Sequence, residues 1–94
     1  MLPQEIAILV GKKPPMNYVL ACLTSFHEGA VEIVIKARGQ SISKAVDIAE
    51  IVKNKFMPNS FIKEVTIDTE EIPLREGGGT KRASSIMIRL SKST

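Results

Sequence analysis

Hydrophobic and polar positions along the chain follow two periods, which predict strands and helices in alternation. Residues 5–10, EIAILV, form a short apolar run that stops at Gly11 and predict a strand followed by a turn. Residues 31–37, VEIVIKA, alternate apolar and polar side chains and predict a second strand. The same period of two returns at 61–72 and 84–91, so two further strands are expected.

Helical spacing fills the two intervals between these strands. Pro14 and Pro15 suit the first turn of a helix, because the missing N–H of proline is not needed there. A helix is therefore predicted from Pro15 to about Gly29, with one buried stripe made of Met16, Val19, Leu20, Leu23 and Phe26. Residues 42–56 repeat the pattern, with buried positions predicted at Ile42, Ala45, Val46, Ala49, Val52 and Phe56.

The resulting order, β-α-β-α-β-β, predicts an α/β two-layer sandwich in which both helices cover one face of a four-stranded mixed sheet. A length of 94 residues allows one hydrophobic core, so residues 1–94 are expected to form a single domain. Residues 75–83, REGGGTKRA, join the last two strands. Three consecutive glycines disfavour a rigid tight turn, so we expect a long, mobile hairpin tip that carries Arg75, Lys81 and Arg82.

Composition and the scarcity of catalytic side chains argue against an enzyme. The chain is 44% hydrophobic and 24% charged, which is typical of a globular protein and not of a membrane span. His27, the only histidine, lies late in the first helix, and Cys22, the only cysteine, falls on its apolar side. Nucleophilic catalysis needs a base beside the nucleophile, and no such pair is evident. We therefore expect no catalytic residue, no metal site and no cofactor.

Basic side chains gather near the ends of the predicted elements, although the net charge is only +3. Lys12 and Lys13 precede the first helix, whose N-terminal amides attract phosphate together with ammonium groups. Arg38 ends the second strand, and Lys44 lies in the first turn of the second helix, where a cation opposes the helix dipole and a phosphate partner would offset it. Lys53 lies late in that helix, where positive charge is favoured in any case. A solvated loop or helix end is the alternative at each position.

Few aromatic side chains accompany these cations. Tyr18 and three phenylalanines are the only aromatic residues, so no platform for stacking single-stranded bases is evident. Contact with the phosphates of a duplex is the binding mode that this composition favours.

Two segments resemble the Alba proteins of archaea, namely GKKPPMNYVLACLT and EIVIKARGQSISKAVDIAEIVKNKF, and with the closing hairpin the resemblance covers about residues 6–90. It implies a fold similar to the C-terminal domain of bacterial translation initiation factor three. It also implies a homodimer that binds double-stranded DNA and RNA with little regard to sequence and organises archaeal chromatin. Such a protein would act in the cytoplasm, on the chromosome and away from membranes. The alternative within this family is a protein that binds mainly RNA or serves as a ribonucleoprotein subunit.

The resemblance also assigns roles to particular residues. The lysine pair of the family matches Lys12 and Lys13, its βα-loop arginine matches Arg38, and its late helical cation matches Lys53. Gln40 stands where many members have a second arginine, which removes one cation but keeps a hydrogen-bonding group. The two hairpin arms of a dimer would contribute further contacts to the duplex from Arg75, Lys81 and Arg82.

Two further roles concern regulation and assembly. Lys12 matches a lysine whose acetylation weakens binding in some members, which implies a lysine acetylase and a deacetylase as partners. Phe56 matches a position that mediates contacts between dimers in some relatives, with packing in the core as the alternative.

Overall fold

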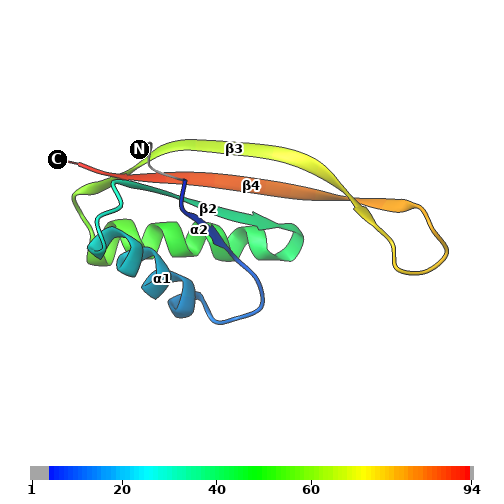
Figure 1. The fold of residues 1–94 in the computed structure, drawn as a ribbon, viewed down its shortest axis with the longest axis horizontal. Helices are drawn as coiled ribbons and strands as arrows, with labels where there is room; N and C mark the ends of the chain where they lie inside the picture. The colour runs from blue at the N-terminus through cyan, green and yellow to red at the C-terminus, as the bar shows by residue number, and fades with distance from the viewer. Residues whose placement is uncertain (1–4, 94) are drawn as a thin grey trace.

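The computed structural model describes residues 5–93 and has the predicted order of strands and helices (Figure 1). A four-stranded sheet has the order β1-β2-β4-β3, with β1 parallel to β2 and the other pairs antiparallel. Both helices lie on one face of this sheet, so the predicted α/β two-layer architecture with a mixed sheet is confirmed. The elements are β1 (Ala7–Leu9), α1 (Pro15–His27), β2 (Glu32–Arg38), η1 (Gly39–Ser41), α2 (Ile42–Ile51), η2 (Val52–Phe56), β3 (Ser60–Pro73) and β4 (Thr80–Lys92).

The core lies between the helices and the inner face of the sheet. Burial of each large aliphatic side chain there stabilises the fold by roughly 1.5–3 kcal/mol relative to exposure. Cys22 belongs to this core, and its burial raises the pKa of the thiol to about 12. The thiol therefore stays protonated at neutral pH, and Cys22 serves as a packing residue. The buried residues of this cluster are Val19, Cys22, Phe26, Ile33, Ile35, Ala37, Ala45, Ile48, Ala49, Val52, Ile88 and Leu90.

The buried stripe of α1 is narrower than the sequence predicted. Val19 is fully buried, but Met16 and Leu20 are 51% and 64% exposed, so their predicted burial is wrong. Successive residues are about 100° apart around a helix, so Leu20 points well away from the direction of Val19. Because α1 packs against α2, η2, β1 and β2 on one side, that side of the helix is covered, while Met16 and Leu20 face solvent.

The second predicted helix is not continuous to residue 56. Regular α-helix ends at Ile51, and η2 is a π-helical turn in which the Met57 N–H donates to the Val52 oxygen at 2.7 Å. The wider turn shifts every later side chain around the helix axis. Val52 stays buried, whereas Phe56 is 49% exposed, so its place in the buried stripe was wrongly predicted.

The strand predicted over 61–72 is confirmed as β3, which has 14 residues, whereas β4 has 13 residues and begins at Thr80, four residues before its predicted start. Only residues 74–79 form the connecting loop, which places Arg75 in it, while Lys81 and Arg82 lie in β4. The predicted length of the tip, residues 75–83, is therefore wrong: the connecting loop is shorter and ends a two-stranded arm that projects beyond the helices (Figure 1). Gly77, Gly78 and Gly79 have φ values of 77°, 71° and 79°, which glycine adopts without a Cβ clash.

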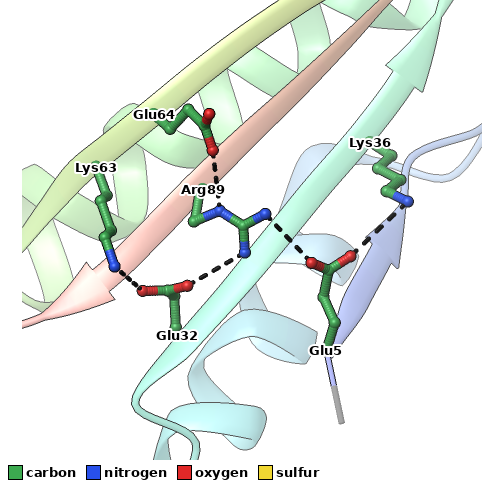
Figure 2. A network of polar contacts seen from close by, with 6 residues as sticks. All are labelled: Glu5, Glu32, Lys36, Lys63, Glu64 and Arg89. Atoms are coloured by element: carbon green, nitrogen blue, oxygen red, sulfur yellow. Dashed lines mark hydrogen bonds and ion pairs between the residues drawn. The ribbon is translucent and has the colours of Figure 1, made fainter.

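A network of charges crosses the outer face of the sheet (Figure 2). Arg89 on β4 donates to Glu5 at 3.2 Å, to Glu32 at 3.1 Å and to Glu64 at 3.2 Å. Lys63 adds a 2.9 Å contact to Glu32. These contacts link β2, β3, β4 and the residues before β1, so they stabilise the alignment of all four strands. Sequence analysis did not identify this network, because its members are up to 84 residues apart.

Acid is expected to weaken this network through Glu32. The hydrogen bond from Lys63, helped by Arg89, holds the pKa of Glu32 below its ordinary value of 4.5. Such a carboxyl stabilises the fold above its unfolded pKa, and the contribution is lost as the pH falls through its folded pKa. We therefore expect the melting temperature to drop as the pH is lowered from about 5 to about 3, and to drop less in a Glu32→Gln variant. Thermal melts across this range check it, and equal losses in both proteins would contradict it.

Candidate nucleic-acid interface

The basic loops predicted from the sequence meet at one edge of the sheet. Because β1 and β2 are parallel, their carboxyl ends lie at the same edge, and the Val10 N–H donates to the Lys36 oxygen at 2.9 Å. Residues 11–13, here called the lysine loop, follow β1, and Arg38 with Gln40 follows at the end of β2. This edge also holds the N-termini of α1 and α2. The fold thus brings together cations that are about 25 residues apart in the chain.

The backbone of the lysine loop is held by two side chains. The Tyr18 hydroxyl accepts hydrogen bonds from the N–H groups of Gly11 at 2.9 Å and Lys13 at 3.2 Å. The Lys44 ammonium donates to the carbonyl oxygens of Gly11 and Lys13, both at 2.8 Å. The side chains of Lys12 and Lys13 are exposed, and neither forms an ion pair with any residue in 5–93. Two ammonium groups therefore extend from a fixed backbone into solvent.

Lys44 has partners that the sequence did not indicate. A cation in the first turn of α2 opposes the helix dipole, and two backbone carbonyls, not only a prospective phosphate, offset that cost. Two of the three N–H donors of the ammonium are used in this way. The contacts of Lys44 could not be predicted from the sequence, since Lys44 is 33 residues from Gly11. The bonds to Tyr18 were not predicted either.

Arg38 is exposed beside the lysine loop and forms an ion pair with the arm. Its Nη1 lies 3.4 Å from Oε1 of Glu70, and the two side chains are 59% and 47% exposed. An exposed pair of this kind is weak, so the guanidinium can exchange its partner for a phosphate at small cost. Gln40 is also exposed, in the short turn η1.

The arm projects from the same edge, because Arg38 at the end of β2 pairs with Ser85 and residues 68–82 continue beyond it. Its charges are mixed. Lys81 lies opposite Ile72 and Arg82 lies opposite Glu71, with Arg75 in the loop between the strands. The three cations of the arm are outnumbered by four carboxylates, Asp68, Glu70, Glu71 and Glu76.

Lys53 and Phe56 lie at the opposite end of the molecule, in η2. Nine helical residues separate Lys53 from Lys44, or about 14 Å, so one protomer does not bring Lys53 to the lysine loop. Phe56 borders a shallow hollow together with Leu23, Thr24, Phe26, His27, Met57 and Lys92.

Three apolar side chains on β3 and α2, which are here called the apolar face, are exposed, and sequence analysis did not predict their exposure. Val65 and Ile67 are 52% and 76% exposed, and they pair with Ile88 and Ile86, whose side chains belong to or pack against the core. Paired residues point to the same side of a sheet, so both lie on the helix side, beyond the cover of α2. Val46 on α2 is 40% exposed. The alternation of apolar and polar residues identifies Val65 and Ile67 as lying on the apolar side of a strand, but it does not show whether another element covers them.

Among residues 5–93, no group of three or more histidine, cysteine, aspartate or glutamate side chains is arranged to hold a metal ion. No helix in the same range is long and apolar enough to cross a bilayer. The lysine loop and Arg38 form the cationic edge of the molecule, beside the carboxylates at the base of the arm.

Fold and site together define a small α/β protein with a fixed cationic loop and a projecting two-stranded arm. The chain belongs to the Alba family, whose sequence model matches residues 6–69. DNA/RNA-binding protein Alba 1 of Archaeoglobus fulgidus is 51% identical over 88 residues, which cover 94% of this chain and 97% of that protein. DNA/RNA-binding protein Alba of Thermoplasma volcanium is 50% identical over 91 residues, which cover 97% of this chain and all of that protein.

Solved structures agree with this assignment. Alba from Thermoplasma volcanium has a TM-score of 0.86 to this chain at 51% identity, with 92% of this chain and 99% of that chain covered. ALBA1 from Trypanosoma brucei has a TM-score of 0.76 at 22% identity, with 97% of this chain and 72% of that chain covered, which shows a similar fold. The resemblance seen in the two sequence segments is thus confirmed.

Proposed function

We propose that this protein binds double-stranded DNA, and RNA, through the phosphates and with little dependence on base sequence. The observation that carries the proposal is the lysine loop, whose backbone is fixed while Lys12 and Lys13 extend into solvent. The relatives named DNA/RNA-binding protein Alba support it. The function is binding without catalysis or a cofactor, carried out by residues 1–94 as one domain.

Phosphate recognition follows from the arrangement of charges at the cationic edge. Lys12, Lys13 and Arg38 approach a phosphate backbone as exposed cations near two helix N-termini, where partial positive charge adds to the attraction. Gln40 donates a hydrogen bond to phosphate without adding charge. The arm then contacts the duplex farther along, with its cations Arg75, Lys81 and Arg82.

The working unit in this proposal is a homodimer joined through the apolar face. Val46, Val65 and Ile67 are exposed in one protomer, and burying them against a second copy would be favourable. Two lysine loops and two arms would then act on one duplex. Lys53 would contribute from η2 of each protomer.

Chromatin organisation would follow from further assembly on the chromosome in the cytoplasm. Phe56 beside its shallow hollow is the candidate contact between dimers. Acetylation of Lys12 by a lysine acetylase would remove one exposed cation from each lysine loop and weaken phosphate binding, and a deacetylase would restore it.

The dependence of affinity on salt tests the main proposal. Three cations from each protomer, Lys12, Lys13 and Arg38, give six phosphate contacts per dimer. The logarithm of the association constant should then fall with the logarithm of salt concentration with a slope of roughly −5. Duplexes of equal length and different sequence should bind with similar constants. An affinity that does not change with salt would contradict phosphate binding.

A mainly RNA-directed role is the second candidate, because the names of the relatives include both nucleic acids. Side chains at one edge of a sheet can approach the backbone of an A-form helix as well as that of DNA. Crosslinking in the native cells, followed by sequencing of the bound nucleic acid, separates the two roles. If RNA predominates among the crosslinked molecules, RNA and not chromosomal DNA is the main ligand.

Removing Glu70 should strengthen binding. Its carboxylate pairs with Arg38 and lies near the expected path of the phosphates, so a Glu70→Gln change frees the guanidinium and removes repulsion. We expect an affinity increase of roughly threefold at low salt, since exposed pairs are worth little. Fluorescence anisotropy with a duplex measures it. Glu28→Gln is the matched control, because this exposed carboxylate follows α1 at the opposite end from the lysine loop and forms no ion pair within residues 5–93, and an equal increase there would attribute the effect to net charge alone.

A further inference from the structure

We propose that Lys44 and Tyr18 are positioning residues for nucleic-acid binding, which hold the lysine loop in its binding conformation and do not themselves contact phosphate. The inference rests on the proposed function and adds two residues to it. From the sequence, Lys44 was expected to contact a phosphate, and no role in binding was predicted for Tyr18.

Within residues 5–93, the Tyr18 hydroxyl and the Lys44 ammonium form hydrogen bonds to the backbone of the lysine loop alone. Gly11 and Lys13 each use their N–H on the Tyr18 hydroxyl and their carbonyl oxygen on the Lys44 ammonium. Four backbone groups in three residues are thus satisfied without a strand or helix partner. The side chains of Lys12 and Lys13 take no part in these bonds and stay available for a ligand.

The two positioning residues come from different helices. Tyr18 lies on α1 with its ring against the core, and Lys44 lies on α2. The loop is therefore fixed relative to both helix N-termini at once, so the two exposed ammonium groups keep one placement at the cationic edge. A loop that is already ordered loses less conformational entropy when it binds, which raises affinity.

The ammonium of Lys44 has little hydrogen-bonding capacity left for a phosphate. Two of its three N–H groups are committed at 2.8 Å, and the bond to the Gly11 oxygen is partly shielded from water. A phosphate ligand would have to displace these bonds or share the one remaining donor. The exposed ammonium groups of Lys12 and Lys13 offer phosphate a contact without that cost.

A mutant cycle tests the proposal, with Lys44→Met made in the native loop and in a Lys12→Gln plus Lys13→Gln background. Affinity for a duplex is measured at about 20 mM salt, where weak binding can still be quantified. A positioning role predicts a loss of roughly tenfold in the native loop and less than about twofold in the background without loop lysines. A loss of the same size in both would make Lys44 a phosphate ligand and overturn the proposal.

Tyr18→Phe is the companion variant, because it removes the hydroxyl without changing charge. It should reduce affinity in the native loop by roughly fivefold and, like Lys44→Met, have little effect in the background without loop lysines. Lys44→Arg, which keeps a donor able to reach both carbonyl oxygens, should recover most of the affinity. Unchanged affinity in both Tyr18→Phe and Lys44→Met would overturn the proposal.

Amide hydrogen exchange provides a readout that needs no nucleic acid. The Gly11 and Lys13 amides donate to Tyr18, so Tyr18→Phe should make them exchange at least tenfold faster while amides in β2 and β4 stay protected. An unchanged exchange rate would overturn the proposal that Tyr18 and Lys44 hold the lysine loop, an arrangement here called the clamp. If removal of Lys12 and Lys13 leaves binding unchanged, the proposed function fails at this site, and the exchange result still decides whether the clamp exists.

Discussion

Replacing both Lys12 and Lys13 with glutamine should weaken duplex binding by roughly 10³-fold at 0.1 M salt. Each homodimer would lose four of six phosphate contacts, so the salt slope should change from roughly −5 to roughly −2. The fold should be unaffected, because both side chains are exposed and the loop is held through its backbone. Anisotropy titrations at several salt concentrations measure both quantities, and thermal melts check the fold.

The matched control for this variant is Lys55→Gln with Lys92→Gln. Lys55 in η2 and Lys92 at the end of β4 lie at the opposite end of the sheet from the lysine loop, neither forms an ion pair within residues 5–93, and the pair removes the same charge. We expect less than a tenfold loss from this control. Equal losses in the two proteins would mean that net charge, and not the placement of the lysine loop, drives binding.

Ile67→Glu should convert the protein from a dimer to a monomer and reduce its affinity for a duplex by roughly a hundredfold. Ile67 is the most exposed residue of the apolar face, so a second copy that covers it would have to bury the new carboxylate without a partner. A monomer keeps three of the six contacts, and the salt slope should fall to roughly −3. Sedimentation equilibrium reports the mass, and anisotropy reports the binding.

Thr66→Glu separates the role of the apolar face from that of added charge. Thr66 pairs with Met87 and points to the other side of the sheet, so the same charge is added to the same strand. This variant should remain dimeric. If Thr66→Glu also dissociates the protein, or Ile67→Glu stays dimeric, the proposed interface is wrong.

The order of elements and most of the core could be predicted from the sequence because local periodicity encodes them. Val19, Ile33 and Ile88 repeat with the period of the element that contains them, and each lies in the core. The same periodicity cannot distinguish a side chain buried within one chain from an apolar side chain that its own chain leaves exposed. Leu20 and Ile67 therefore looked like core or strand positions but are exposed.

The rest of the site depends on contacts between distant residues, which no local pattern contains. The loop lysines were found because they follow a strand and precede a helix. Their clamp was missed because Lys44 reaches a loop more than 30 residues away. The arm was underestimated because Thr80, Lys81 and Arg82 are exposed polar residues at the start of β4, so no apolar alternation marked that strand before residue 84.

The mixed charge of the arm has a consequence for the kinetics of binding. Between residues 68 and 82 the three cations and four carboxylates nearly cancel, so the arm exerts little attraction on a distant polyanion. The lysine loops would then set the association rate, which falls as salt increases. Contacts made by the arm after docking would instead lengthen the residence time, and this contribution would persist at salt concentrations that slow the encounter.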